Sequence, residues 1–253
     1  MASRKESTYQ AGETKIYGIS ACLAVFKKRS HDIVKVYLAE SRLKTLSDLI
    51  RFCVAQRKAY KVVATEELEK ITESIHHEGV CLIAKEAKTL RFDDLLIKLK
   101  SEQKPSCLLY LDGVEKPHNV GNILRAAAHF GVTALITAQK EFATLPPSAR
   151  RVSEGGSEFV PVVLVRDPVS DLSKLKNIGF EVFATSSHAK KSIYQIKIPN
   201  RSVWILGSEV RGISPALQKL ATHTVLIPGT NAVESLNIAS AAAILMSEFY
   251  RAF

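Results

Sequence analysis

The sequence predicts an α/β protein with two domains, the second of which is built on a mostly parallel sheet. The 253 residues are enough for two domains of ordinary size. Short apolar segments typical of strands alternate with segments of helical periodicity along the chain. The alternation stops at a charged stretch and restarts after Pro105. Apolar strands that alternate with helices form parallel sheets covered on both faces, and this gives the fold class.

The first domain is predicted over residues 12–88. Residues 1–11 are small and polar and are expected to form a disordered tail. The expected elements are helix 18–29, strand 33–39, helix 43–58, strand 60–64, helix 65–72 and strand 79–85. The second helix is strongly amphipathic, with one side formed by Leu43, Leu46, Leu49, Ile50, Cys53 and Val54. Thr65 is expected to cap the third helix, because threonine is a good capping residue and the glutamates Glu66, Glu67 and Glu69 follow it.

A charged connector, residues 89–105, is predicted as the linker between the domains. It ends in Lys-Pro, which is typical of a boundary. The stretch "FDDLLIKL" within it has apolar periodicity and predicts a short helix.

The second domain is predicted over residues 106–253. The expected strands are 107–114, 133–138, 159–165, 180–185, 202–208 and 224–228. The expected helices are 119–131, about 148–155, 168–177, 214–221 and 235–251. Because ligands of parallel sheets bind beyond the carboxyl ends of the strands, we expect a site in the segments that follow the strands.

The charge of the chain favours an anionic partner. The formal net charge is +10 and the isoelectric point is near 9.4. The first domain has 14 basic and 10 acidic residues, and the second has 15 and 11, so both contribute. A basic surface spread over both domains predicts binding to nucleic acid.

The cysteines and histidines do not indicate a metal site. Cys22, Cys53, Cys81 and Cys107 are 26 to 31 residues apart in apolar sequence, which predicts buried thiols in a reducing compartment. His76 and His77 lack further ligands at metal-binding spacing, so a structural or RNA-contacting role is expected. With no apolar signal core and no apolar run near 18 residues, we expect a cytoplasmic protein without a membrane segment.

Three segments after predicted strands could form a ligand site. In "NVGNILRAA", Gly121 permits a tight turn, Asn119 can cap the helix and Arg125 falls in its second turn. In "LGSEVRG", two glycines bracket a turn that suits close approach to a ligand. In "IPGTNAVESLNIASAAA", Ser235 is a good helix cap, Asn237 falls in the first turn and the alanines permit close helix packing. Taken singly, each segment also fits a purely structural turn or cap. Neither a G-x-G-x-x-G fingerprint nor a P-loop is present, which disfavours those nucleotide folds.

Together, the three segments resemble motifs 1, 2 and 3 of the SpoU (TrmH-type) family in the SPOUT superfamily, in the right order and spacing. Members of this family are S-adenosyl-L-methionine-dependent RNA methyltransferases that form 2′-O-methylribose in tRNA or rRNA. Residues 12–88, ending in "HHEGVCLIA", resemble the L30e-like substrate-binding domain often fused in front. The resemblance implies a trefoil-knotted SPOUT domain and a homodimer with alanine-rich helices at its interface.

The resemblance also implies roles for individual residues. The implied catalytic residues are Asn119, Arg125, Glu209, Ser235 and Asn237, with the first two beside the target ribose. The cofactor would be held largely through backbone groups by Leu206, Gly207, Ser208, Glu209, Gly212, Ile227, Pro228, Ser235 and Leu236. Two motifs depart from the family pattern. Val210 stands where glycine is common in motif 2, and Gly229 and Asn231 stand where methionine and glycine are common in motif 3.

The chemistry of methyl transfer requires alignment and removal of the 2′-hydroxyl proton, without a metal or a nucleophilic residue. Because a guanidinium stays protonated in proteins, we expect Arg125 to bind the adjacent phosphate and stabilise the developing alkoxide. Further candidates for phosphate contacts are Lys27, Lys28, Arg29, Arg57, Lys58, Arg150 and Arg151. The main alternative is a non-catalytic RNA-binding or ribosome-assembly factor that retains the fold. An oxidoreductase fits the sheet but has no fingerprint in the sequence.

Overall fold

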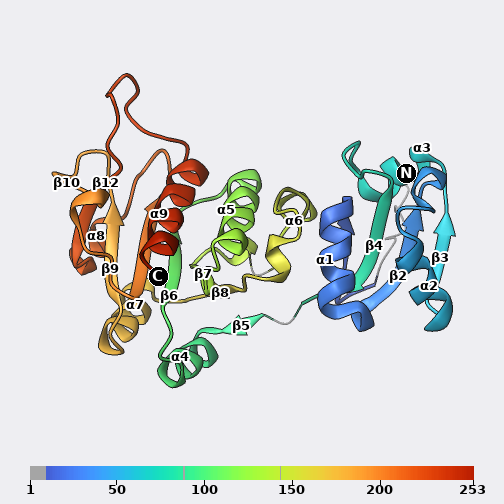
Figure 1. Ribbon diagram of the computed structural model, residues 1–253, viewed down its shortest axis with the longest axis horizontal. Coiled ribbons are helices and arrows are strands. Elements are labelled where there is room, and N and C mark those ends of the chain that lie inside the picture. Colours follow the sequence, from blue (N-terminus) through green and yellow to red (C-terminus); the bar gives the residue numbers. More distant parts are fainter. Residues whose placement is uncertain (1–9, 88, 143) are drawn as a thin grey trace, which may run out of the picture.

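The computed structural model describes residues 10–87, 89–142 and 144–253. It shows an N-terminal unit around a small sheet and a C-terminal unit around a larger one (Figure 1). The predicted disordered tail falls almost entirely outside the described residues. Among the helices that the structure describes, none has the length and apolar character needed to span a bilayer.

The N-terminal unit has a four-stranded sheet in the order β1-β4-β2-β3. Its elements are β1 (Glu13–Tyr17), α1 (Ile19–Arg29), η1 (Ser30–Asp32), β2 (Ile33–Leu38), η2 (Glu40–Arg42), α2 (Ser47–Ala55), β3 (Ala59–Val62), α3 (Thr65–Thr72) and β4 (Val80–Lys85). Strand β1 is not predicted by the sequence, and Gly18, with φ 92°, turns the chain from this strand directly into α1. The predicted cap at Thr65 is wrong, because Thr65 is already helical and Ala64 precedes it without a side-chain cap.

The C-terminal sheet has eight strands in the order β10-β12-β9-β11-β6-β7-β8-β5, and every pair is parallel. Its strands are β5 (Leu90–Arg91), β6 (Ser106–Asp112), β7 (Ala134–Thr137), β8 (Val162–Leu164), β9 (Glu181–Thr185), β10 (Lys191–Ser192), β11 (Arg201–Gly207) and β12 (His223–Leu226). The helices are α4 (Phe92–Ser101), α5 (Pro117–His129), η3 (Lys140–Phe142), α6 (Pro147–Val152), η4 (Gly156–Glu158), α7 (Pro168–Asn177), η5 (Ile193–Gln195), α8 (Pro215–Leu220) and α9 (Ile238–Ala252). The predicted mostly parallel sheet is confirmed.

The predicted linker packs against the C-terminal sheet. Its strand β5 pairs with β8 at the sheet edge, and its helix α4 buries Phe92, Leu95 and Leu99. A two-residue strand is too short to show period-two alternation, so the sequence reveals α4 but neither β5 nor β10.

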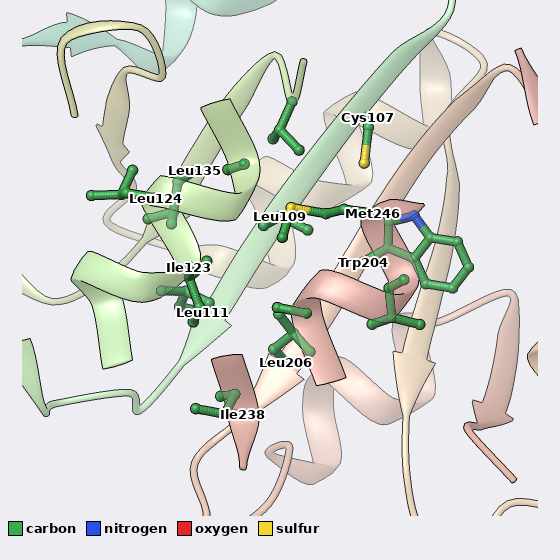
Figure 2. Packing of buried hydrophobic residues seen from close by; sticks show 14 of the residues in the cluster. Cys107, Leu109, Leu111, Ile123, Leu124, Leu135, Trp204, Leu206, Ile238 and Met246 are labelled. Carbon is green, nitrogen blue, oxygen red and sulfur yellow. The ribbon is translucent and has the colours of Figure 1, made fainter. Parts of the chain in front are cut away.

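The sheet has a hydrophobic layer on each face. Successive side chains of a strand point to opposite faces, so Leu109 and Leu111 of β6 join one core while Leu108 and Tyr110 join the other. Helices α5 and α9 cover the first face, with Leu124, Met246 and Trp204 packed together in the core that Figure 2 shows. Helices α4, α7 and α8 cover the second face. Because α5 and α9 pack on the same face of the sheet, both helices begin near the edge formed by the carboxyl ends of the strands.

Two predicted helix starts are wrong. Helix α5 begins at Pro117, which suits the first helical position, so Asn119 lies inside the helix and Arg125 falls in its third turn. Gly121 is helical and not at a turn, and a Cβ there would lie 2.7 Å from the Ala149 carbonyl oxygen of α6. The cap of α9 is Asn237 and not Ser235, because the Asn237 side chain accepts from the Ala239 amide at 2.9 Å.

Candidate active site

Three segments far apart in the sequence meet at the carboxyl edge of the sheet. Neighbouring strands β6 and β11 end there. Helix α5 starts shortly after β6 and presents Asn119, which is 7% exposed. The turn after β11 presents Glu209, and the N-terminus of α9 presents Asn237.

Asn119, Glu209 and Asn237 form one hydrogen-bonded cluster. The Asn237 amide nitrogen donates to Asn119 Oδ1 at 3.2 Å and to Glu209 Oε1 at 3.1 Å. The Asn119 amide nitrogen donates to the same Glu209 oxygen at 3.4 Å. Three of the five residues that the resemblance marks as catalytic therefore lie in direct contact.

Lys116 completes this cluster and was not predicted. Its Nζ donates to Glu209 Oε2 at 2.8 Å. This hydrogen bond is the main cause of a lowered Glu209 pKa, followed by the charge of Lys116 and by hydrogen bonds from Asn119 and the Ile238 backbone. Glu209 is therefore ionised at neutral pH. The available signal was a lysine between a strand end and the proline that starts a helix, which is too common to single out Lys116.

The turn after β11 requires glycine at Gly207. A Cβ at this position would lie 2.2 Å from the Gly212 carbonyl carbon. Gly212 has φ +65° and donates its amide to the Ser208 carbonyl at 2.9 Å, which closes the turn. The Asp112 carboxylate at the end of β6 accepts from the Ser214 amide at 2.7 Å and ties the turn to the neighbouring strand.

Neither departure from the family pattern forces a strained backbone. Asn231 adopts φ 62°, and asparagine is the residue other than glycine that tolerates this region best. Val210 is not among the described residues with positive φ, and its side chain is 93% exposed. Asn231 and Val210 therefore both fit the backbone conformation of their loops without strain.

A cavity of about 200 Å³ adjoins the cluster. Residues that line it include Gly113, Lys116, Asn119, Ser208, Glu209 and Ile238. Beside it, the loop from Gly229 to Leu236 is exposed throughout, including the apolar Val233 and Leu236. The close approach at Gly207 leaves backbone rather than side chains at the end of β11, which fits a cofactor held through backbone groups.

The other predicted residues lie outside the cluster. Arg125 is exposed and lines a different cavity, which shares no lining residue with the first. Ser235 is exposed and makes none of the hydrogen bonds of the cluster. Leu206 is buried in the core, while after β12 Ile227 is half-buried and Pro228 is exposed.

Three of the predicted phosphate contacts have carboxylate partners within the protein. Arg29 and Arg150 are buried and both pair with Glu158, at 2.7 and 3.7 Å. Arg151 pairs with Glu78 at 2.8 Å and donates to the His76 carbonyl at 3.0 Å. Arg29 and Arg151 join the two units, and a sequence pattern cannot distinguish an arginine at such a contact from a solvated one.

The remaining polar predictions concern thiols and histidines. All four cysteines are free and buried, as predicted, and burial raises the pKa of each thiol. His77 is buried and its Nδ1 accepts from the Gly79 amide, a structural role. Over the described ranges, no three His, Cys, Asp or Glu side chains gather in a way that could hold a metal ion.

Comparison with known proteins places this chain among the RNA methyltransferases with the SPOUT fold. The SpoU rRNA Methylase family matches residues 106–247, and the RNA 2′-O ribose methyltransferase substrate binding family matches residues 15–90. The chain belongs to the SpoU rRNA methylase family. At the level of the family, the predicted S-adenosyl-L-methionine-dependent RNA 2′-O-methyltransferase is confirmed.

Similar proteins match along nearly the whole chain. An uncharacterized tRNA/rRNA methyltransferase, YfiF of Escherichia coli O157:H7, is 32% identical over 96% of this chain and 69% of its own length. The 23S rRNA (guanosine-2′-O-)-methyltransferase RlmB of Pseudomonas putida is 30% identical over 94% of this chain and 96% of its own. The solved SpoU methyltransferase AviRb of Streptomyces viridochromogenes, in complex with AdoMet, superposes with a TM-score of 0.75. It is 21% identical, over 95% of this chain and 90% of that one, and so supports the fold alone.

Proposed function

We propose that this chain methylates a ribose 2′-hydroxyl of ribosomal RNA at the cluster of Asn119, Glu209 and Asn237. The observation that carries the proposal is the meeting of three motif segments, 90 and 118 residues apart, in direct hydrogen bonds. Such a constellation holds reacting groups in a fixed geometry, which is what transfer of an already activated methyl group requires. When bound, S-adenosyl-L-methionine supplies that methyl group.

The residues of the cluster have distinct roles in this proposal. Asn119 and Asn237 present amides that orient the ribose and the cofactor. Glu209 positions both amides and is not the proton acceptor, because its lowered pKa and its cationic partner make it a weak base. The backbone of Leu206, Gly207, Ser208, Gly212, Ile227, Pro228 and Leu236 holds the cofactor, with Ser235 at the loop crossing.

Arg125 is proposed to bind the phosphate next to the target ribose. Its guanidinium is exposed and, within the described residues, makes no hydrogen bond or ion pair. An unpaired guanidinium binds phosphate bidentately, which lysine cannot do. Arg125→Lys should therefore lose most turnover, and near-normal turnover with unchanged RNA binding would contradict this role.

We also propose a homodimeric cytoplasmic protein whose C-terminal domain is knotted as a trefoil. Helices α5 and α9 pack on each other, and the half-buried Ala239, Ala241 and Ala243 of α9 would face a second copy. The knot is proposed because the chain belongs to the SpoU family and has the fold of its solved members. Sedimentation analysis tests the dimer.

The test of the function is methyl transfer from labelled S-adenosyl-L-methionine to an unmodified 23S rRNA transcript. Digestion to nucleosides should yield a labelled 2′-O-methylnucleoside. Calorimetry should show that the protein binds S-adenosyl-L-methionine. RNA binding with neither cofactor binding nor transfer would instead support the alternative, a non-catalytic assembly factor.

A further inference from the structure

A second cavity, of about 650 Å³, lies where the two units meet. Its lining comes from three segments: Ser20 of α1, the face of α5 with Asn122, Arg125 and His129, and the turn from Ser153 to Gly156 with Phe159. In Figure 1 the α6 region stands between α5 and α1. We call this cavity the interdomain groove.

Two glycines bring the walls of the groove together. Gly155 has φ +86°, and a Cβ there would lie 2.5 Å from the Ala24 Cβ and 3.1 Å from the Ser20 carbonyl oxygen of α1. A Cβ at Gly156 would lie 2.5 Å from the Leu124 carbonyl oxygen of α5. The turn therefore contacts a helix of each unit at backbone distance.

A buried ion pair holds the same junction. Arg29 of α1 donates to both carboxylate oxygens of Glu158, from Nε at 2.7 Å and from Nη2 at 3.1 Å. The two side chains are 10% and 5% exposed. A bidentate pair so well buried fixes one orientation, so the groove exists before any ligand binds.

The groove presents unpaired groups suited to a nucleotide. Arg125 has no partner among the described residues, and the one acid in the lining, Glu154, has Arg151 within 4.0 Å. Phe159 is 46% exposed, with Lys28 Nζ 4.4 Å from its ring centroid. Exposed aromatic rings beside cations bind single-stranded nucleic acid, since bases stack on the ring and phosphates meet the cations.

We infer that the interdomain groove binds an unpaired nucleotide of the RNA substrate, its base on Phe159 and its phosphate between Arg125 and Lys28. The inference rests on the proposed function and extends it to the form of the substrate. RNA would be held by both units at once, with a nucleotide near the target withdrawn from any helix. The positive charges of Arg125 and Lys28 favour RNA over an apolar protein segment as the occupant.

The test combines crosslinking and binding to a 23S rRNA transcript that contains 4-thiouridine. Irradiation of the wild-type protein should crosslink the RNA to the peptide that carries Phe159. Phe159→Ala should weaken RNA binding at least about fivefold, the lower end for loss of one base stack, and Phe159→Trp should restore it. The matched control is Tyr194→Ala. Tyr194 is an exposed aromatic residue of η5, which follows the edge strand β10, and its removal should leave RNA binding unchanged.

A second pair of variants tests the cation. Lys28→Gln should weaken RNA binding more than Lys27→Gln, because both lysines are exposed but only Lys28 lies over Phe159. Calorimetry should show unchanged S-adenosyl-L-methionine binding in every variant. If the wild type binds and methylates RNA while Phe159→Ala behaves like Tyr194→Ala, this inference is wrong and the proposed function stands. If the wild type neither binds nor methylates RNA, the proposed function itself fails.

Discussion

Two glutamates with cationic partners occupy opposite environments in this protein. Glu158 is 5% exposed and accepts two hydrogen bonds from Arg29 at the junction of the two units. Glu209 is exposed, accepts from Lys116, and also accepts from the amides of Asn119 and Asn237.

The difference separates a structural role from a functional one. Removing one member of a buried pair leaves an uncompensated charge in a medium of low dielectric, which is strongly destabilising. An exposed pair is screened by water and contributes little to stability, so the four-residue cluster at Glu209 is explained by what it positions. Stability should therefore respond to Glu158, and methyl transfer to Glu209.

The largest expected effect is on Glu158. Glu158→Gln keeps the side-chain shape but removes the counter-charge of buried Arg150 and leaves buried Arg29 with only Asp32, 3.5 Å away, so the free energy of unfolding should fall by about 3–5 kcal/mol. Urea denaturation measures this free energy of unfolding. The control is Glu67→Gln, in an exposed pair with Lys61, which should cost less than about 1 kcal/mol. Equal losses in the two variants would remove the contrast.

The next effect concerns the turn that presents Glu209. Gly207→Ala places a Cβ 2.2 Å from the Gly212 backbone, so the turn must move, at a cost of about 1–3 kcal/mol. S-adenosyl-L-methionine binding, measured by calorimetry, should weaken with it. Gly229→Ala is the matched control, since its Cβ would meet nothing within 4 Å and its φ is not left-handed. Normal cofactor binding in Gly207→Ala would show that this turn does not shape the site.

Glu209→Gln should separate activity from stability. The negative charge is lost, and a single acceptor oxygen remains where Lys116 and the two amides use two, so the site loosens and methyl transfer should fall about 10- to 100-fold. The melting temperature should hardly change, because the side chain is exposed and its ion pair is screened by water. Transfer rate and melting temperature measured on one preparation decide the matter. A stable variant with full activity would leave the cluster without a catalytic purpose.

The smallest effect is on the pH dependence. The Lys116 hydrogen bond holds the Glu209 pKa below its ordinary value of about 4.3, so the ionised cluster persists as pH falls and is lost only through that lowered pKa. Lys116→Met should bring the Glu209 pKa back towards its ordinary value and move the acid limb of methyl transfer to higher pH. A pH–rate profile of both proteins checks the direction. If the acid limb of the profile stays at the same pH in Lys116→Met, the loss of activity at low pH belongs to a group other than Glu209.

Element type was predictable wherever the periodic pattern was long. The six predicted strands of the second domain and helix α4 are present, because side chains such as Leu108 and Leu109 alternate between two buried faces. Helix caps were less predictable. Asn237 rather than Ser235 caps α9, since both are good capping residues and the choice depends on where the loop arrives.

The candidate site was predictable as a set of segments. Family motifs pointed to Asn119, Glu209 and Asn237, and the structure joins them. They could not indicate Lys116, whose role depends on a partner 93 residues away. Nor could they separate Arg29, which is buried against Glu158, from Lys28, which is exposed beside it.

The sequence by itself determined the two-domain α/β architecture, the basic surface and the three motif segments, because periodicity, composition and motif identity are local properties of the chain. Only the tertiary structure decided that Asn119 and Arg125, six residues apart on α5, face separate cavities. It also decided that α1 docks beside Arg125 through Gly155 and Glu158. These are contacts between distant segments, and their energies depend on burial and distance that exist only after the sheet and its helices have packed.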